Sequence, residues 1–214
     1  MTERVKITIF SDYVCPFCML AEGPLEEATK DLKVDIEWKP FELRAHPTPT
    51  LRPEDEYLPA IWARAVYPLA RRVGVDITLP TVSPQPYTHL AFEGYQFAAE
   101  HGLGTEYTHR MFRAFFQEDQ DLGQPDVLQA LAEEIGLDGA AFRTALDDRT
   151  YRDKHQDALR EAQAHQIQTV PTILIGDTRI EGVPSPVQLR KAILDTQAQQ
   201  LVPFGGTCDV NGGC

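Results

Sequence analysis

The four residues Cys15-Pro16-Phe17-Cys18 constrain the fold most, because they stand between a strand pattern and a helix pattern. The β-branched and aromatic residues from Val5 to Phe10 predict a short buried strand. After Cys15, the stretch from Pro16 to Lys30 spaces its apolar residues as a helix does, and a proline fits the first helical turn because its missing N–H has no partner there. The sequence therefore predicts a strand that leads straight into a helix, with both cysteines at the junction. We expect Gly23-Pro24 to kink this helix.

The other strand patterns lie at the two ends of a long helical segment. Apolar and charged residues alternate from Lys33 to Pro40, which predicts a second strand. Two short runs, 172–175 and 179–181, flank the turn Gly176-Asp177 and predict a hairpin. Ser185 is a suitable cap for a final helix. The order of elements is therefore β-α-β, a helical segment, then β-β-α, which predicts an α/β fold.

The segment between the two halves begins as a loop and continues as helices. The proline-rich, polar stretch from Arg44 to Pro59 predicts the loop. Helical periodicity follows over 87–100, 105–119, 126–135, 138–146 and 150–166, and Asp138 is a candidate cap. The aromatic stripe Phe112, Phe115 and Phe116 is expected to pack as core between these helices, and a part of it is a candidate wall of an apolar groove above the cysteines.

These patterns divide the chain into three parts. We expect residues 1–43 and 166–200 to form one domain, residues 44–165 to form a helical insertion domain, and residues 201–214 to form a flexible tail that contains cysteines.

Composition narrows the choice of partners and compartment. The formal net charge is -12, from 32 acidic and 20 basic residues, and no run of Lys and Arg is present, so we expect neither nucleic acid nor a membrane surface as a partner. The N-terminus lacks the pattern of a signal peptide, and no stretch approaches the roughly 18 apolar residues of a membrane span. We therefore expect a cytoplasmic protein, in which a pair of cysteines is more often redox-active or metal-binding than a structural disulfide.

Two thiols at the start of a helix predict dithiol chemistry. The unpaired N–H groups of the first turn favour the thiolate of Cys15, which is the nucleophile of disulfide exchange, and Cys18 lies one turn further on, where it can attack a mixed disulfide formed at Cys15. Such a site needs no cofactor beyond its own dithiol. The alternatives are two structural thiols or half of a zinc site, which would need further ligands from Cys208, Cys214 or the histidines. We favour the redox site and expect no bound metal.

Two further features concern this site. In Thr169-Val170-Pro171-Thr172 a proline precedes an apolar strand and fits the first strand position, because it cannot donate to the ladder. Cys208 and Cys214 in the glycine-rich tail are either incidental thiols or a second redox pair that exchanges with the first.

The motifs SDYVCPFC and TVPTILIG, with a helical insertion between them, resemble the thioredoxin-fold dithiol oxidoreductases of the DsbA family. The stretch EWKPFEL, residues 37–43, makes the chain most similar to the cytoplasmic FrnE-like branch. The resemblance implies a thioredoxin fold with a large all-helical insertion. It also implies an exposed nucleophile at Cys15, a buried resolving thiol at Cys18, and a cis-proline at Pro171 packed against the disulfide. Val170 would offer backbone hydrogen bonds to an extended substrate, which Pro16 and Phe17 would also contact.

The function that we predict is thiol-disulfide oxidoreductase or isomerase activity on protein disulfides, with glutathione or a cellular dithiol as a possible reductant. Because Pro16-Phe17 replaces the pair that includes histidine in DsbA, we expect a less oxidising couple. One alternative is a glutathione-dependent isomerase similar to the 2-hydroxychromene-2-carboxylate isomerases, although that family typically carries serine at the position of Cys15. The other is a chaperone-like binding protein with incidental thiols.

Three carboxylates are candidates for accepting the proton of Cys18: Asp12, Glu37 and Glu42. For each of them we expect a solvated surface position instead, because strand-face carboxylates usually face water.

Overall fold

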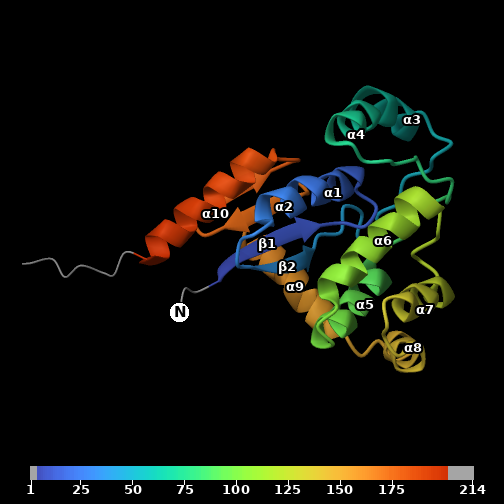
Figure 1. Ribbon diagram of the computed structural model, residues 1–214. Coiled ribbons are helices and arrows are strands. Elements are labelled where there is room, and N and C mark those ends of the chain that lie inside the picture. Colours follow the sequence, from blue (N-terminus) through green and yellow to red (C-terminus); the bar gives the residue numbers. More distant parts are fainter. Residues whose placement is uncertain (1–3, 202–214) are drawn as a thin grey trace, which may run out of the picture.

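A four-stranded sheet lies at the centre of the computed structural model, which describes residues 4–201 (Figure 1). The strands are β1 Val5–Ser11, β2 Val34–Pro40, β3 Thr172–Ile175 and β4 Thr178–Glu181. Their order in the sheet is β2-β1-β3-β4, with β1 parallel to β2 and antiparallel to β3. This is a thioredoxin fold, as expected from the sequence.

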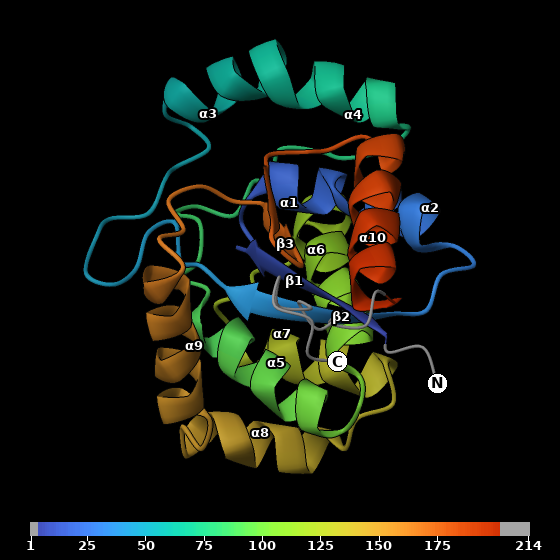
Figure 2. The same cartoon turned by 90° about the vertical axis from the view of Figure 1, so that its left-hand side faces the viewer.

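Helices cover both sides of the sheet (Figures 1 and 2). On one side lie α1 Pro16–Leu20, α2 Glu22–Thr29 and α10 Pro186–Leu201. The long insertion between β2 and β3 holds α5 His89–Glu100, α6 Gly104–Glu118, α7 Pro125–Glu134, α8 Gly139–Asp147 and α9 Arg152–Ala164. Two predicted caps are present, because the side chain of Asp138 accepts a hydrogen bond from the N–H of Ala141 and that of Ser185 from the N–H of Gln188.

The insertion packs onto the sheet through one continuous hydrophobic core. The predicted aromatic stripe of α6 is part of it, since Phe112, Phe115 and Phe116 are at most 1% exposed. Burial of three aromatic side chains in one place stabilises the contact between the sheet and the insertion strongly.

The first helix breaks earlier than expected. The sequence predicted a kink at Gly23-Pro24, whereas the break between α1 and α2 lies at Ala21. The physical cause is the same proline, because Pro24 has no N–H to donate to the carbonyl of Leu20 and its ring would collide with that carbonyl. The distortion therefore appears one turn before the proline.

The predicted loop ends sooner than Pro59, and a helical hood follows it. The hood comprises α3 Tyr57–Ile61, the π-helix η1 Trp62–Val66 and α4 Tyr67–Val73, which arch over the start of α1 (Figure 2). Pro59 falls in the first turn of α3, where its missing N–H has no helical partner. Pro68 cannot donate to the carbonyl of Arg64, and the helix immediately before it has the wider π geometry. Among residues 4–201, no helix has the length and apolarity to cross a membrane.

Candidate active site

Both cysteines of the CPFC stretch lie where β1 gives way to α1. Cys15 is the N-cap residue of α1 and has an extended backbone, and its N–H donates to the carbonyl of Asp12 at 3.0 Å. The N–H of Cys18 in turn donates to the carbonyl of Cys15 at 3.1 Å, which closes the first turn. Both side chains are free thiols. The tight turn from Asp12 to Cys15 therefore holds the dithiol and a carboxylate together.

The Val170-Pro171 segment lies beside the first cysteine. The peptide bond between Val170 and Pro171 is cis, and the thiol of Cys15 donates to the carbonyl oxygen of Val170 at 3.6 Å. The carbonyl of Pro171 accepts a hydrogen bond from the N–H of Gly182 at 2.8 Å, which ties the segment to the end of β4. Residues 155 positions apart in the chain are thus brought together at the dithiol.

Cys15 is less accessible than the resemblance implied. Only 3% of this residue is exposed, against 0% of Cys18, so the expectation of an exposed nucleophile is wrong for this structure. The reason is the hood, which lies over the start of α1 and encloses a cavity of about 230 Å³ in front of Cys15. Pro16, Phe17 and Val170 line this cavity as well.

The far wall of the cavity consists of residues that the sequence did not single out. Most of them are apolar: Leu43, Leu51, Tyr57, Leu58, Ile61, Trp62, Val66 and Pro86. Arg44, Gln85 and Thr88 add polar groups. The aromatic stripe of α6 does not belong to the lining. A signal for the hood was present, because Leu58, Ile61, Trp62 and Val66 have helical spacing, but it followed directly on the proline-rich loop pattern.

Asp12 is buried at the turn that precedes Cys15, which corrects the expectation of a solvated carboxylate. It is 1% exposed, and its Oδ2 atom accepts a hydrogen bond from the N–H of Leu43 at 2.7 Å. Its Oδ1 atom has no partner among the described residues. Burial outweighs the Leu43 hydrogen bond and raises the pKa of Asp12 to about 6.

The same burial acts on the resolving thiol. Loss of solvation raises the pKa of Cys18 well above its usual range, and the neighbouring Cys15 and the charge of Asp12 raise it further. Cys18 therefore remains protonated unless a base takes its proton. The charge of Asp12 acts on Cys18 and Asp12 also lines the cavity, so it is the candidate acceptor of that proton.

The other two carboxylates are also not simply solvated. Glu42 is paired with His155, whose Nε2 atom lies 2.6 Å from Glu42 Oε1 and whose side chain is 0% exposed. Glu37 is one-third exposed and forms ion pairs with Lys6 and Lys39. Glu42 therefore has an imidazole partner and Glu37 has two lysine partners, and no hydrogen bond within residues 4–201 joins either carboxylate to the cysteines.

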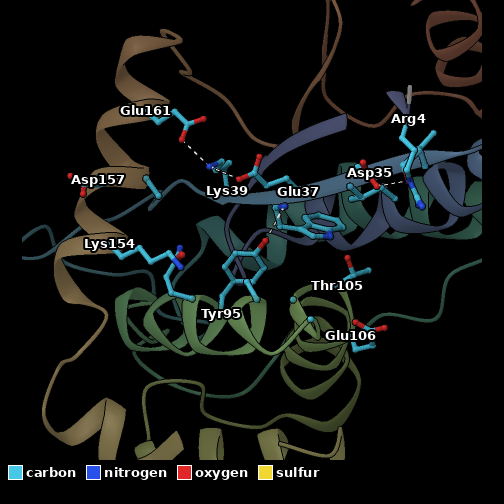
Figure 3. A pocket seen from close by; sticks show the side chains of 18 residues that line it. Arg4, Asp35, Glu37, Lys39, Tyr95, Thr105, Glu106, Lys154, Asp157 and Glu161 are labelled. Atoms are coloured by element: carbon cyan, nitrogen blue, oxygen red, sulfur yellow. Dashed lines mark hydrogen bonds and ion pairs between the residues drawn. The ribbon is translucent and has the colours of Figure 1, made fainter. Parts of the chain in front are cut away.

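Another hollow lies away from the dithiol, along the outer edge of β2 (Figure 3). It measures about 760 Å³, and its charges are largely matched in pairs. Lys39 lies between Glu37 and Glu161, and Arg4 pairs with Asp35. The hydroxyl of Tyr95 accepts from the outward N–H of Trp38 at 3.2 Å. We find no chemistry at this hollow that the dithiol requires.

Two predicted site residues, Cys208 and Cys214, lie outside the described residues. Within residues 4–201, no group of three or more His, Cys, Asp and Glu side chains is arranged to hold a metal ion.

A dithiol at a strand-to-helix junction, facing a cis-proline segment on a four-stranded sheet, defines the class of thioredoxin-fold thiol oxidoreductases. The chain belongs to the family of DSBA-like thioredoxin domains, which matches residues 6–194. It is 49% identical over 198 residues to the uncharacterized protein YwbO of Bacillus subtilis (strain 168), an alignment that covers 92% of this chain and 99% of YwbO.

Solved structures share the fold at low sequence identity. A 2-hydroxychromene-2-carboxylate isomerase superimposes with a TM-score of 0.73 at 18% identity, covering 92% of this chain and 100% of the isomerase. The cytosolic disulfide reductase DsbM from Pseudomonas aeruginosa superimposes with a TM-score of 0.65 at 20% identity, covering 91% and 96%, and its structure is also known with GSH. At these identities the likeness shows the fold and leaves the reaction open.

Proposed function

We propose that this oxidoreductase reduces or isomerises disulfides in polypeptide substrates through Cys15 and Cys18, without a further cofactor. The observation that carries the proposal is the arrangement of three groups between Asp12 and Cys18: Cys15 on the cavity, Cys18 fully buried, and Asp12 buried where its charge acts on Cys18. The arrangement suits a nucleophile, a resolving thiol and a base.

The reaction begins at Cys15. Its thiolate attacks one sulfur of the substrate disulfide, a Cys15–substrate disulfide forms, and the other substrate sulfur leaves as a thiolate that takes a proton from solvent. In the isomerase direction this substrate thiolate attacks another disulfide of the same polypeptide and displaces a new thiolate. The new thiolate attacks the substrate sulfur of the mixed disulfide, a different substrate disulfide forms, and Cys15 leaves unchanged as a thiolate. The hood excludes bulk water from this step because Cys15 is only 3% exposed.

Resolution uses Cys18. Asp12 takes the proton of Cys18, and the resulting thiolate attacks the sulfur of Cys15. The Cys15–Cys18 disulfide forms and the second substrate sulfur leaves as a thiolate that takes the proton held by Asp12, so the substrate gains two electrons and two protons. Two molecules of glutathione or one cellular dithiol return these electrons to the protein.

Extended polypeptide is the substrate form that the rim of the cavity favours. The carbonyl of Val170 lies beside the sulfur of Cys15 and is an acceptor for a backbone N–H of an extended segment. Leu43 and Tyr57, at 46% and 60% exposure, are two of the four large apolar side chains that the described chain leaves exposed, and both border the cavity. Exposed apolar side chains next to a functional cavity favour apolar residues near the substrate cysteine.

A glutathione-dependent small-molecule isomerase is the second candidate. The specific observation in its favour is that Cys15 faces an enclosed cavity of only about 230 Å³. That reaction would not need a resolving thiol, so a Cys18→Ser variant would keep it. A chaperone-like binder would suppress aggregation even as the Cys15→Ser, Cys18→Ser double variant.

The test is to trap the mixed disulfide. The Cys18→Ser variant should accumulate a covalent complex between Cys15 and a model protein whose disulfides have been reduced and formed again. The complex persists because the variant has no thiol at position 18 to resolve the mixed disulfide. Cys15→Ser should form none, and it serves as the matched control. Mass spectrometry of alkylated samples identifies the sulfurs. Disulfide turnover by Cys15→Ser at the rate of the unchanged protein would exclude the mechanism.

Asp12→Asn separates the base from the nucleophile. We expect formation of the mixed disulfide to proceed and its release to slow by about 10²–10⁴-fold near neutral pH, the range of a lost general base. Release that is equally fast in Asp12→Asn would remove Asp12 from the mechanism.

The tail cysteines are assigned a relay role in the same proposal. Cys214 is the thirteenth residue after Leu201, the end of α10, and a chain of that length can reach up to about 45 Å. α10 itself spans about 24 Å for its 16 residues, so the tail is long enough to return to the active site. Replacing Cys208 and Cys214 with Ser should slow steady-state turnover with a limiting dithiol, and unchanged turnover would end this part of the proposal.

A further inference from the structure

A third hollow of the molecule, of about 640 Å³, is lined by basic groups. We call it the arginine hollow. It lies between the segment after β2, the start of α5 and the length of α9. Its charged and imidazole side chains are Arg149, Arg152, Arg160, His46, His89 and Glu42. Three arginines in one hollow are unexpected in a chain with 32 acidic and 20 basic residues.

The two faces of α9 carry different charges. The face on the arginine hollow presents Arg152, Gln156, Arg160 and Gln163, and none of these is acidic. The face on the hollow beside β2 presents Lys154, Asp157 and Glu161 instead (Figure 3). The acidic side chains of this helix are therefore kept off the arginine hollow.

The arginines of the hollow differ in how far they are neutralised. Arg149 makes two hydrogen bonds to the buried carboxylate of Glu93, at 2.8 and 2.6 Å, so that pair is internally balanced. Arg160 pairs with Asp157, three residues earlier in α9, and the two side chains are 65% and 67% exposed. The side chain of Arg152 makes no ion pair or hydrogen bond within residues 4–201. Arg152 is thus unpaired among the described residues, and Arg160 can exchange its exposed partner for a new anion, because an exposed ion pair contributes little stability.

The one carboxylate of the hollow does not cancel this charge. Glu42 is 8% exposed on its side chain and is bonded to the buried ring of His155. The first residue of α5, His89, is also part of the lining, and the positive end of that helix dipole favours an anion nearby.

One short segment lines both the arginine hollow and the cavity of the active site. Leu43 and Arg44 line the cavity in front of Cys15, and the residues on either side of them, Glu42, Ala45 and His46, line the hollow. A polypeptide that crosses this segment would contact both.

We propose that the arginine hollow binds acidic side chains of the polypeptide whose cysteine reacts at Cys15. The inference rests on the proposed function and names its preferred substrates: disulfides flanked by runs of Asp or Glu. The carboxylates would pair with Arg152 and Arg160, whose planar guanidinium groups suit bidentate contacts to carboxylate.

The experiment separates binding from turnover. A cysteine-free peptide with four glutamates, labelled with a neutral dye, is titrated with the protein at low salt against the same peptide with four glutamines. We expect the Glu peptide to bind about tenfold more tightly than the Gln peptide, because it can form two exposed ion pairs that the Gln peptide cannot form. The double variant Arg152→Gln, Arg160→Gln should bind both peptides equally. The matched control Arg113→Gln, Lys191→Gln removes the same two charges from elsewhere and should keep the preference.

Turnover is then measured with disulfide forms of both peptides. In the unchanged protein, the KM of the Glu peptide should be lower than that of the Gln peptide. In the Arg152, Arg160 double variant, the two KM values should be equal. Equal binding of the Glu and Gln peptides by the unchanged protein, or a preference that survives in the double variant, would overturn the proposal. Inorganic phosphate that competes more strongly than NaCl of equal ionic strength would assign the hollow to a free anion and overturn it too. If the Glu peptide binds as expected but neither disulfide is reduced, the proposed function fails and the docking surface stands.

Discussion

Replacement of Asp12 by Asn tests the electrostatics of the active site most directly. Burial raises the pKa of Asp12 from its ordinary 3.8 to about 6. One pKa unit corresponds to 1.36 kcal/mol, so this rise amounts to about 3 kcal/mol of preference for the neutral form in the folded protein. An asparagine has nearly the same shape, keeps an oxygen that accepts from the N–H of Leu43, and carries no charge.

Proton linkage determines whether stability rises or falls with pH. The folded-state pKa is above the unfolded one, so between pH 3.8 and about 6 the folded protein binds more protons than the unfolded protein. Its stability therefore falls as pH rises through this window, and the loss is complete above the folded pKa. Asp12→Asn escapes this loss, and we expect it to exceed the unchanged protein in stability by up to about 3 kcal/mol above pH 7, and by much less at pH 4.

The assay is urea unfolding followed by the fluorescence of Trp38 and Trp62, with a reductant present so that both cysteines are thiols. The difference in unfolding free energy between the two proteins is plotted at pH 4 to 8, because other groups that titrate in this range cancel in the difference. Asp177→Asn, at an exposed turn, is the control and should leave stability nearly unchanged at every pH. A difference that does not grow with pH between 4 and 6 would refute the assignment of Asp12 as a buried carboxylate that resists ionisation.

The remaining predictions concern a pH-dependent pair, the hood and the redox couple. Burial lowers the pKa of His109, but its hydrogen bond to Glu22 and the nearby carboxylates raise it more, so the net shift is upward. Burial also raises the pKa of Glu22. Both upward shifts make the stability of the folded protein fall as pH rises. His109→Gln should therefore destabilise the protein more at pH 6 than at pH 9, as measured by urea midpoints. Trp62→Ala should cost about 3–5 kcal/mol, because this side chain is 1% exposed and contacts the rings of Tyr67 and Phe116, and Tyr57→Ala, at 60% exposure, is its matched control. The Cys15–Cys18 couple should be less oxidising than DsbA, with a potential below about −120 mV in glutathione titrations, because Pro16 and Phe17 offer no side-chain hydrogen bond to a thiolate.

The parts of the fold that could be predicted are those with local causes. The strand before Cys15 and the helix after it follow from side-chain alternation and from Pro16 in a first turn. The caps at Asp138 and Ser185 depend on single side chains that bond to a backbone N–H three residues later. Each of these signals lies within a few residues of the structure that it specifies.

The environment of the dithiol has causes that are distant in sequence. Asp12 looks like a strand-end carboxylate, and only the arrival of Leu43, 31 residues later, provides its hydrogen bond and helps to bury it. The burial of Glu42 requires His155, 113 residues away. The cover over Cys15 comes from the hood, whose helical spacing is interrupted by Pro59 and Pro68 and by a π turn. A pattern search in a single sequence has no access to such pairings.

The hydrogen bond between Cys15 and Val170 links the state of the nucleophile to substrate binding. In the thiol form, the S–H of Cys15 donates to the carbonyl of Val170. A thiolate has no hydrogen to donate, and neither has a mixed disulfide, so the same carbonyl becomes free to accept a backbone N–H in both of the states that engage substrate. In the proposed reaction the substrate segment therefore gains its backbone contact when Cys15 becomes reactive. When the thiol reforms, its S–H competes with the substrate N–H for the carbonyl of Val170. This competition weakens the backbone contact and favours release of the reduced product.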